Sequence, residues 1–105
     1  MNFTTQTGRD DYALRSFDRY KQDQSSVTST KSRRYQVLVV MEAYDAFMSL
    51  QTTATELASF FSGFGVDYRG TSKKSIAHHY VAGDHNLQSR YPFKRLVELY
   101  GCRNF

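Results

Sequence analysis

The segment of residues 33–50 places the strongest constraint on the fold, because its apolar side chains repeat with the period of an α-helix. Glu42 and Asp45 lie away from the apolar stripe. Taken alone, the β-branched stretch 35–40 would also suit a strand. The helical period continues beyond that stretch, so we interpret the whole segment as a helix. The stripe expected to face the core comprises Val37, Val40, Met41, Tyr44, Phe47 and Met48.

The next segment carries signals for both ends of a helix. Thr53 and Glu56 match the capping box, in which each side chain satisfies the free backbone N–H of the other residue. Gly63 and Gly65 supply a C-terminal stop. Between these signals lies an apolar face formed by Leu57, Phe60, Phe61 and Phe64.

A further helix is predicted to begin at Thr71 or Ser72, whose hydroxyl groups can cap it. We expect it to run through Tyr80 and to be followed by a turn over residues 82–86. Its inward-facing residues are expected to be Ile76, Ala77 and Tyr80.

The last helix is predicted to follow Pro92, which suits a first helical position because its missing N–H would be unpaired there anyway. Gly101 is a C-terminal stop for this helix. Its apolar face comprises Phe93, Leu96, Val97 and Tyr100. Together these patterns predict an all-α protein, a small bundle of about four to five helices.

The N-terminal part is expected to be an arm attached to this helical domain. Asp10 or Asp11 can cap a short helix with Ala13, Phe17 and Tyr20 on one face, which would pack on the core or on a second chain. A Ser/Thr-rich stretch without periodicity follows and is typical of a linker. The predicted division is therefore an arm over residues 1–31 and a helical domain over residues 32–105.

Composition limits the cellular setting and the size of the core. The chain has 105 residues, which fits one small domain, and its polar start is no signal peptide. Its apolar runs stay far below the roughly 18 residues of a membrane helix, so no membrane partner is expected. The single Cys102 favours a reducing, cytoplasmic setting. Because a core of about 70 residues is small, we expect a homodimer to bury the remaining aromatic side chains.

Charge is distributed unevenly along the chain. The net charge is +4, yet residues 1–68 hold seven basic and eight acidic side chains, a balance of −1. Residues 69–105 hold seven basic and two acidic side chains, a balance of +5. A basic patch attracts polyanions, because neutralised phosphates release their condensed counterions. Solvated charges on exposed helix faces are the alternative interpretation.

The most informative motif is the stretch 70–80, which combines a glycine, a hydroxyl cap and a basic pair. A turn and a basic amphipathic helix follow, as in a helix-turn-helix, where the first helix crosses the phosphate backbone and the second enters the major groove. Lys73 and Lys74 fall in the first turn of their helix, where the helix dipole is already positive. A phosphate bound there would make this placement favourable. Side chains that extend into water are the alternative.

The string Gly-Thr-Ser-Lys-Lys-Ser-Ile at residues 70–76 resembles the opening of several helix-turn-helix regulators, including the Pap-type regulators of fimbrial operons. In those proteins a turn and a helix with an Arg-Leu pair follow, which would correspond here to Arg95 and Leu96. A similar string occurs in the Gam-type phage inhibitors of a host recombination nuclease. No family is assigned from so short a segment. Pro92 leaves two alternatives, a base-reading helix that begins there after a long loop or a motif that is not a true helix-turn-helix.

We therefore expect a small DNA-binding protein of helix-turn-helix type that regulates transcription or replication. The residues expected to contact phosphates are Arg69, Ser72, Lys73 and Lys74. Those expected to approach bases or the opposite strand are Asn86, Gln88, Arg90, Lys94 and Arg95.

The alternative function is that of a protein-binding inhibitor or adaptor, of the kind that phages and other mobile elements encode. Its partner would present an acidic surface to the basic patch, or an apolar surface to Phe17, Tyr20 and the long helix. DNA binding would weaken steeply with salt, whereas an interface built on aromatic side chains would not.

No catalytic residue, metal site or cofactor is predicted. His79 and His85 lie six positions apart, outside the usual spacing of zinc ligands, and a second cysteine is missing. Cys102 has Arg103 beside it, whose charge would favour the thiolate, but no positioned base is identifiable. Aromatic residues that could stack on unpaired bases have the helical spacing of a core: Phe60, Phe61, Phe64 and Tyr68.

Overall fold

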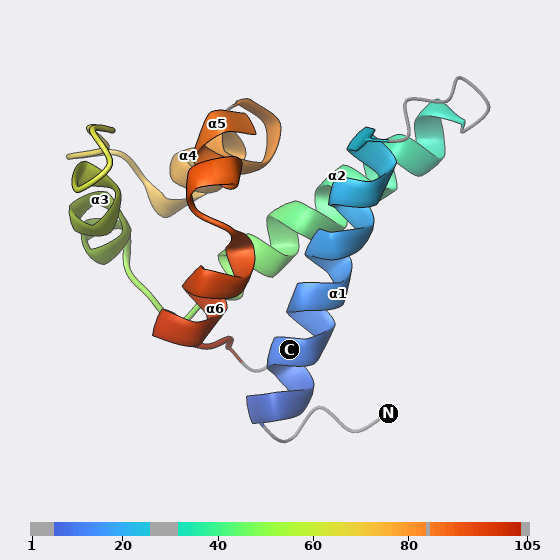
Figure 1. Ribbon diagram of the computed structural model, residues 1–105, viewed down its shortest axis with the longest axis horizontal. Coiled ribbons are helices and arrows are strands. Elements are labelled where there is room, and N and C mark those ends of the chain that lie inside the picture. The colour runs from blue at the N-terminus through green and yellow to red at the C-terminus, as the bar shows by residue number, and fades with distance from the viewer. Residues whose placement is uncertain (1–5, 26–31, 84, 104–105) are drawn as a thin grey trace.

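The computed structural model describes residues 6–25, 32–83 and 85–103, and the regular elements within these ranges are helices (Figure 1). This confirms the predicted all-α fold. None of these helices is long and apolar enough to span a membrane. In chain order the elements are α1 (Gln6–Ser25), α2 (Arg33–Met48), α3 (Ala54–Ser62), α4 (Lys73–His78), the π-helical turn η1 (His79–Gly83), α5 (His85–Arg90) and α6 (Phe93–Tyr100).

The N-terminal helix is longer than expected and belongs to the core. α1 has 20 residues, whereas the sequence predicts a short helix starting at Asp10 or Asp11. It packs along α2 (Figure 1). The core therefore extends further toward the N-terminus than residue 32, and the expected linker falls mainly on residues 26–31, outside the described ranges. The α1 side chains buried in the core are Ala13, Phe17 and Tyr20.

α2 is apolar on two faces, and the predicted core stripe is wrong at Val37 and Met41, which lie on the face turned away from the core. Val37 and Met41 are 51% and 55% exposed, and Leu38 beside them is 53% exposed. The alanines of the other face let a neighbouring helix approach closely, which favours that face for packing. The buried residues of α2 are Val39, Ala43, Ala46 and Phe47, while Val40, Tyr44 and Met48 pack at the edge of the core.

Local hydrogen bonds begin two helices where the sequence predicts them. The Thr53 side chain accepts a hydrogen bond from the Glu56 N–H at 3.1 Å, and its hydroxyl donates to the Glu56 carboxylate at 3.1 Å. Ser72, and not Thr71, caps α4 by accepting from the Ser75 N–H at 3.2 Å. Both caps satisfy backbone donors that a helix start leaves without partners.

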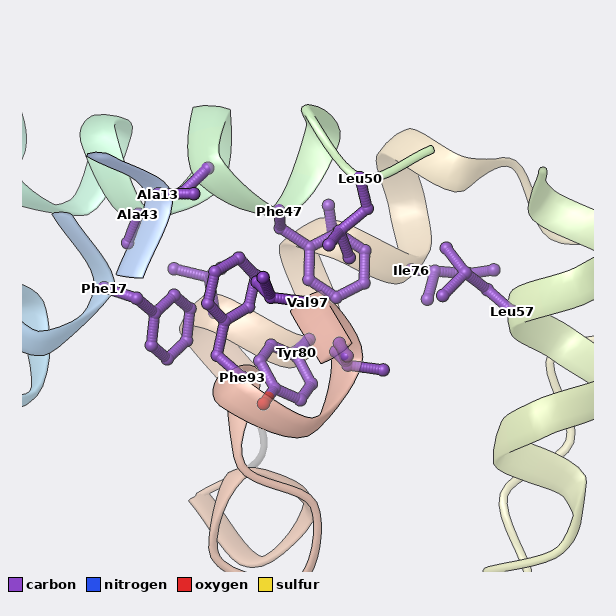
Figure 2. Close-up of a cluster of buried hydrophobic side chains, with 14 of the residues drawn as sticks. Ala13, Phe17, Ala43, Phe47, Leu50, Leu57, Ile76, Tyr80, Phe93 and Val97 are labelled. Atoms are coloured by element: carbon purple, nitrogen blue, oxygen red, sulfur yellow. The ribbon is translucent and has the colours of Figure 1, made fainter. Parts of the chain in front are cut away.

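Aromatic side chains from α1, α2, η1 and α6 meet at the centre of the molecule (Figure 2). The rings of Phe17 and Phe93 stack with centroids 4.5 Å apart, and those of Phe47 and Tyr80 lie 5.1 Å apart. The Tyr80 hydroxyl donates to the backbone oxygen of Tyr91 at 2.6 Å, so its polar end is satisfied. This cluster holds the N-terminal helix and the last helix together.

The C-terminal third contains an additional helix. The turn predicted over residues 82–86 is wrong in part, because η1 follows α4 directly and α5 begins at His85. α6 follows Pro92 and ends before Gly101, as predicted, and Gly101 has a φ of 66° that suits glycine. Three short helical pieces thus precede α6 where one helix through Tyr80 and a turn were expected.

Candidate nucleic-acid interface

Four of the residues predicted to contact DNA are exposed on the last three α-helices: Lys74 on α4, Arg90 on α5, and Lys94 and Arg95 on α6. The Arg95 guanidinium lies 3.5 Å from the Glu98 carboxylate. Both side chains are more than half exposed, so water and salt screen this pair. All four cations are therefore accessible to a ligand.

Lys73 has a different environment from its neighbour. Its ammonium group donates to the backbone oxygens of Leu50 at 2.7 Å and Met48 at 3.3 Å, at the C-terminal end of α2. Carbonyl groups at a helix C-terminus carry partial negative charge and favour a cation. Burial, together with the charge of Arg103, nevertheless lowers the pKa of Lys73 to about 8. The ammonium group of Lys73 is thus engaged by backbone carbonyls within the molecule and does not point to an external phosphate.

Lys74 lines a shallow hollow of about 570 Å³ together with Tyr44, Ser75, His78 and His79. The two imidazoles and the Ser75 hydroxyl can donate hydrogen bonds to an anion beside the ammonium group. Lys74 and both histidines are exposed. Of the two adjacent lysines, Lys74 is therefore the one available to an external phosphate.

Arg69 and Ser72 are both engaged in local contacts. The Arg69 guanidinium donates to both carboxylate oxygens of Asp67, at 3.1 and 3.0 Å, and its backbone N–H donates to the same carboxylate at 3.1 Å. The side-chain hydrogen bond between them lowers the pKa of Asp67 and raises that of Arg69. Ser72 uses its hydroxyl to cap α4 and donates it to the Ser75 hydroxyl at 3.0 Å. The side chains of Arg69 and Asp67 are 87% and 65% exposed, so a phosphate could compete with Asp67 for the Arg69 guanidinium.

Gln88 is buried, so it does not face solvent as expected for a base contact. Its amide donates to the backbone oxygens of Tyr80 at 2.6 Å and Val81 at 3.2 Å. Those carbonyl groups belong to η1, where the wider helical turn breaks the regular hydrogen-bond ladder. Gln88 thus joins α5 to η1. The side chain of Asn86 falls outside the described part of the structure.

A groove of about 580 Å³ lies between α3 and the loop before α4, and the sequence patterns did not predict it. Small side chains at every fourth position of α3 leave this space open, which is the only signal for it in the sequence. Arg69 is the charged residue among its lining residues. The groove is lined by Ala54, Thr55, Ala58, Ser59, Ser62 and the segment 69–72.

The described residues contain no group of three or more His, Cys, Asp or Glu side chains placed to hold a metal ion. Cys102 is fully buried, and its backbone pairs with that of Leu50. Burial raises the pKa of the Cys102 thiol to about 11, so the thiolate that Arg103 was expected to favour does not form near neutral pH.

Comparisons with family models, with curated proteins and with solved structures find no match for this chain. The structure thus defines a small all-α protein with exposed basic residues on α4, α5 and α6. The resemblance to helix-turn-helix regulators therefore remains limited to the short segment 70–76.

Proposed function

We propose that the protein binds DNA mainly through the phosphate backbone, as a small regulator of transcription or replication. The observation that carries the proposal is the exposure of Lys74, Arg90, Lys94 and Arg95 in the basic part of the chain. Each phosphate that such a side chain neutralises releases condensed counterions, which favours association at low salt. The imidazoles beside Lys74 add further donors for the same phosphate.

The contacts assigned to DNA differ from those expected from sequence alone. We assign neither Lys73 nor Gln88 to DNA, because both hold backbone carbonyls within the fold. Of the two alternatives that Pro92 leaves open, we favour a groove-facing helix that begins there. α6 has eight residues, a length of about 12 Å, comparable to the width of the major groove. Lys94 and Arg95 are exposed in its first turn.

The test is fluorescence anisotropy with a labelled random-sequence duplex, titrated from low to physiological salt. Lys94→Ala/Arg95→Ala removes two cations from α6. Lys21→Ala/Arg15→Ala removes two exposed cations from α1 and is the control with the same change in net charge. If both α6 residues contact phosphates, the salt slope of log K falls by about 1.8 in the α6 variant.

The wild-type protein should bind with strong salt dependence, and the control variant should keep most of the wild-type slope. Absence of binding even at low salt would contradict the proposal. An equal loss in the two double variants would also contradict it, because the attraction would then reflect net charge and no particular surface.

The alternative of an inhibitor or adaptor is favoured by one observation, the exposed apolar residues of α2. Phe17 and Tyr20, which were considered for such a role, are buried in the core and are not accessible. Phe60 and Phe61 of α3 pack on each other, and Phe60 and Phe64 pack on Tyr91. A protein partner would therefore bind α2, and its binding would depend weakly on salt.

A further inference from the structure

The exposed face of α2 contains a straight stripe of four residues. Arg34, Leu38, Met41 and Asp45 are separated by four, three and four positions, which is the spacing of the contact line in a coiled coil. Leu38 and Met41 at its centre are 53% and 55% exposed, and Val37 beside them is 51% exposed. The stripe covers about 17 Å of helix. It is long enough to receive another helix.

The two ends of the stripe carry opposite charges. Arg34 lies at the N-terminal end and Asp45 at the C-terminal end, and both are exposed. Glu42, which lies beside the stripe, forms an ion pair with Arg19 of α1 and so belongs to the α1–α2 contact. The stripe therefore has an apolar centre, a positive end and a negative end.

We propose that this stripe binds a second copy of the chain, with the two α2 helices antiparallel about a two-fold axis. In that arrangement Leu38 packs against Met41 of the second copy, and Arg34 faces Asp45 of the second copy. The two-fold axis repeats both contacts, so each dimer has two ion pairs at the ends of one apolar contact. A parallel arrangement would place like charges together and is disfavoured.

Self-complementarity identifies the second copy as the occupant. A two-fold interface needs a surface that fits itself after reversal, and both the charges and the apolar residues of this stripe meet that condition. Burying the exposed side chains at its centre supplies the favourable free energy, and the end charges set the direction. This inference concerns α2 and does not depend on DNA binding by α4, α5 and α6.

Charge reversal and mixing test the arrangement, with sedimentation equilibrium as the measurement. Arg34→Glu places two acidic residues opposite each other at both ends of the dimer, and Asp45→Arg places two basic residues there. Each variant alone should self-associate about tenfold or more weakly than the wild type. When the two variants are mixed in equal amounts, both ends pair glutamate or aspartate with arginine, so association should return to the wild-type level.

Two outcomes would overturn the proposal. A wild-type chain that stays monomeric up to its solubility limit would leave this face to a different protein. Single variants that associate as well as the wild type, or a mixture that does not recover association, would exclude the antiparallel pairing. Leu38→Lys should also abolish association. Circular dichroism checks that each variant keeps its helices, since every substituted side chain is exposed in the monomer.

Discussion

The two apolar faces of α2 differ in what covers them. Ala43 and Phe47 lie in the cluster of buried side chains that Figure 2 shows, and Val39 is buried as well. Leu38 and Met41 are more than half exposed. Either face has the composition of a core. The difference therefore depends on which face the rest of the chain reaches, and an apolar face left uncovered is available to another molecule.

The largest change in the free energy of unfolding is expected from a substitution on the buried face of α2. Phe47→Ala removes a fully buried ring that packs on Tyr80 and should lower the free energy of unfolding by about 3–5 kcal/mol. Because the chain has no tryptophan, urea unfolding is best followed by circular dichroism. A loss below about 1 kcal/mol would mean that this face is not packed as described.

A smaller change in the free energy of unfolding is expected at Lys73, which donates hydrogen bonds to backbone carbonyls at the C-terminal end of α2. Lys73→Met keeps the apolar stem but leaves the Leu50 and Met48 carbonyls without a donor. Above a pH of about 8, where the folded lysine is neutral and its amine still donates, unfolding should therefore become easier by about 1 kcal/mol. Lys74→Met is the matched control and should change stability little, because Lys74 is exposed. Equal effects of the two substitutions would contradict the distinction between the lysines.

The same lysine should make stability depend on pH above about 8. Folding lowers the pKa of Lys73 from 10.5 to about 8, so between these values the unfolded chain binds more protons than the folded one. The free energy of unfolding should therefore rise with pH in this range. The raised pKa of Cys102 acts in the opposite direction above about 9. Comparing wild type with Lys73→Met between pH 8 and 9 isolates the effect, and a rise in the variant as steep as that in the wild type, or steeper, would contradict it.

The smallest effect on stability is expected on the exposed face of α2. Leu38→Ser in dilute protein should change the free energy of unfolding by no more than about 0.5 kcal/mol, because the monomer does not bury this side chain. The same urea titration used for Phe47→Ala measures it. A cost comparable to that of Phe47→Ala would show that the core covers Leu38.

Features that depend on a few neighbouring residues were predictable from the sequence. The caps at Thr53 and Ser72 and the stop at Gly101 each involve hydrogen bonds or backbone angles within one turn. The exposed cations Lys94 and Arg95 were also found, because α6 has a clear separation of apolar and charged residues.

Features that depend on distant segments were not predictable. Lys73 and Leu50 are 23 positions apart, and nothing near either residue indicates their hydrogen bond. The burial of Gln88 follows from the π turn, which has no sequence signature here. The period of α2 identified an apolar face correctly but could not show which of two such faces α1 would cover.

In this account the core covers one face of α2 and a second copy of the chain covers the other. Methyl NMR of the wild-type protein at increasing concentration tests both statements together. The chain contains three methionines, so the Met41 methyl signal is readily assigned by substitution. The signals of Met41 should shift as the second copy covers the exposed face, while those of Ala43 and Ala46 in the core should stay constant. A Met41 signal that does not change with concentration, or alanine signals that change equally, would contradict the account.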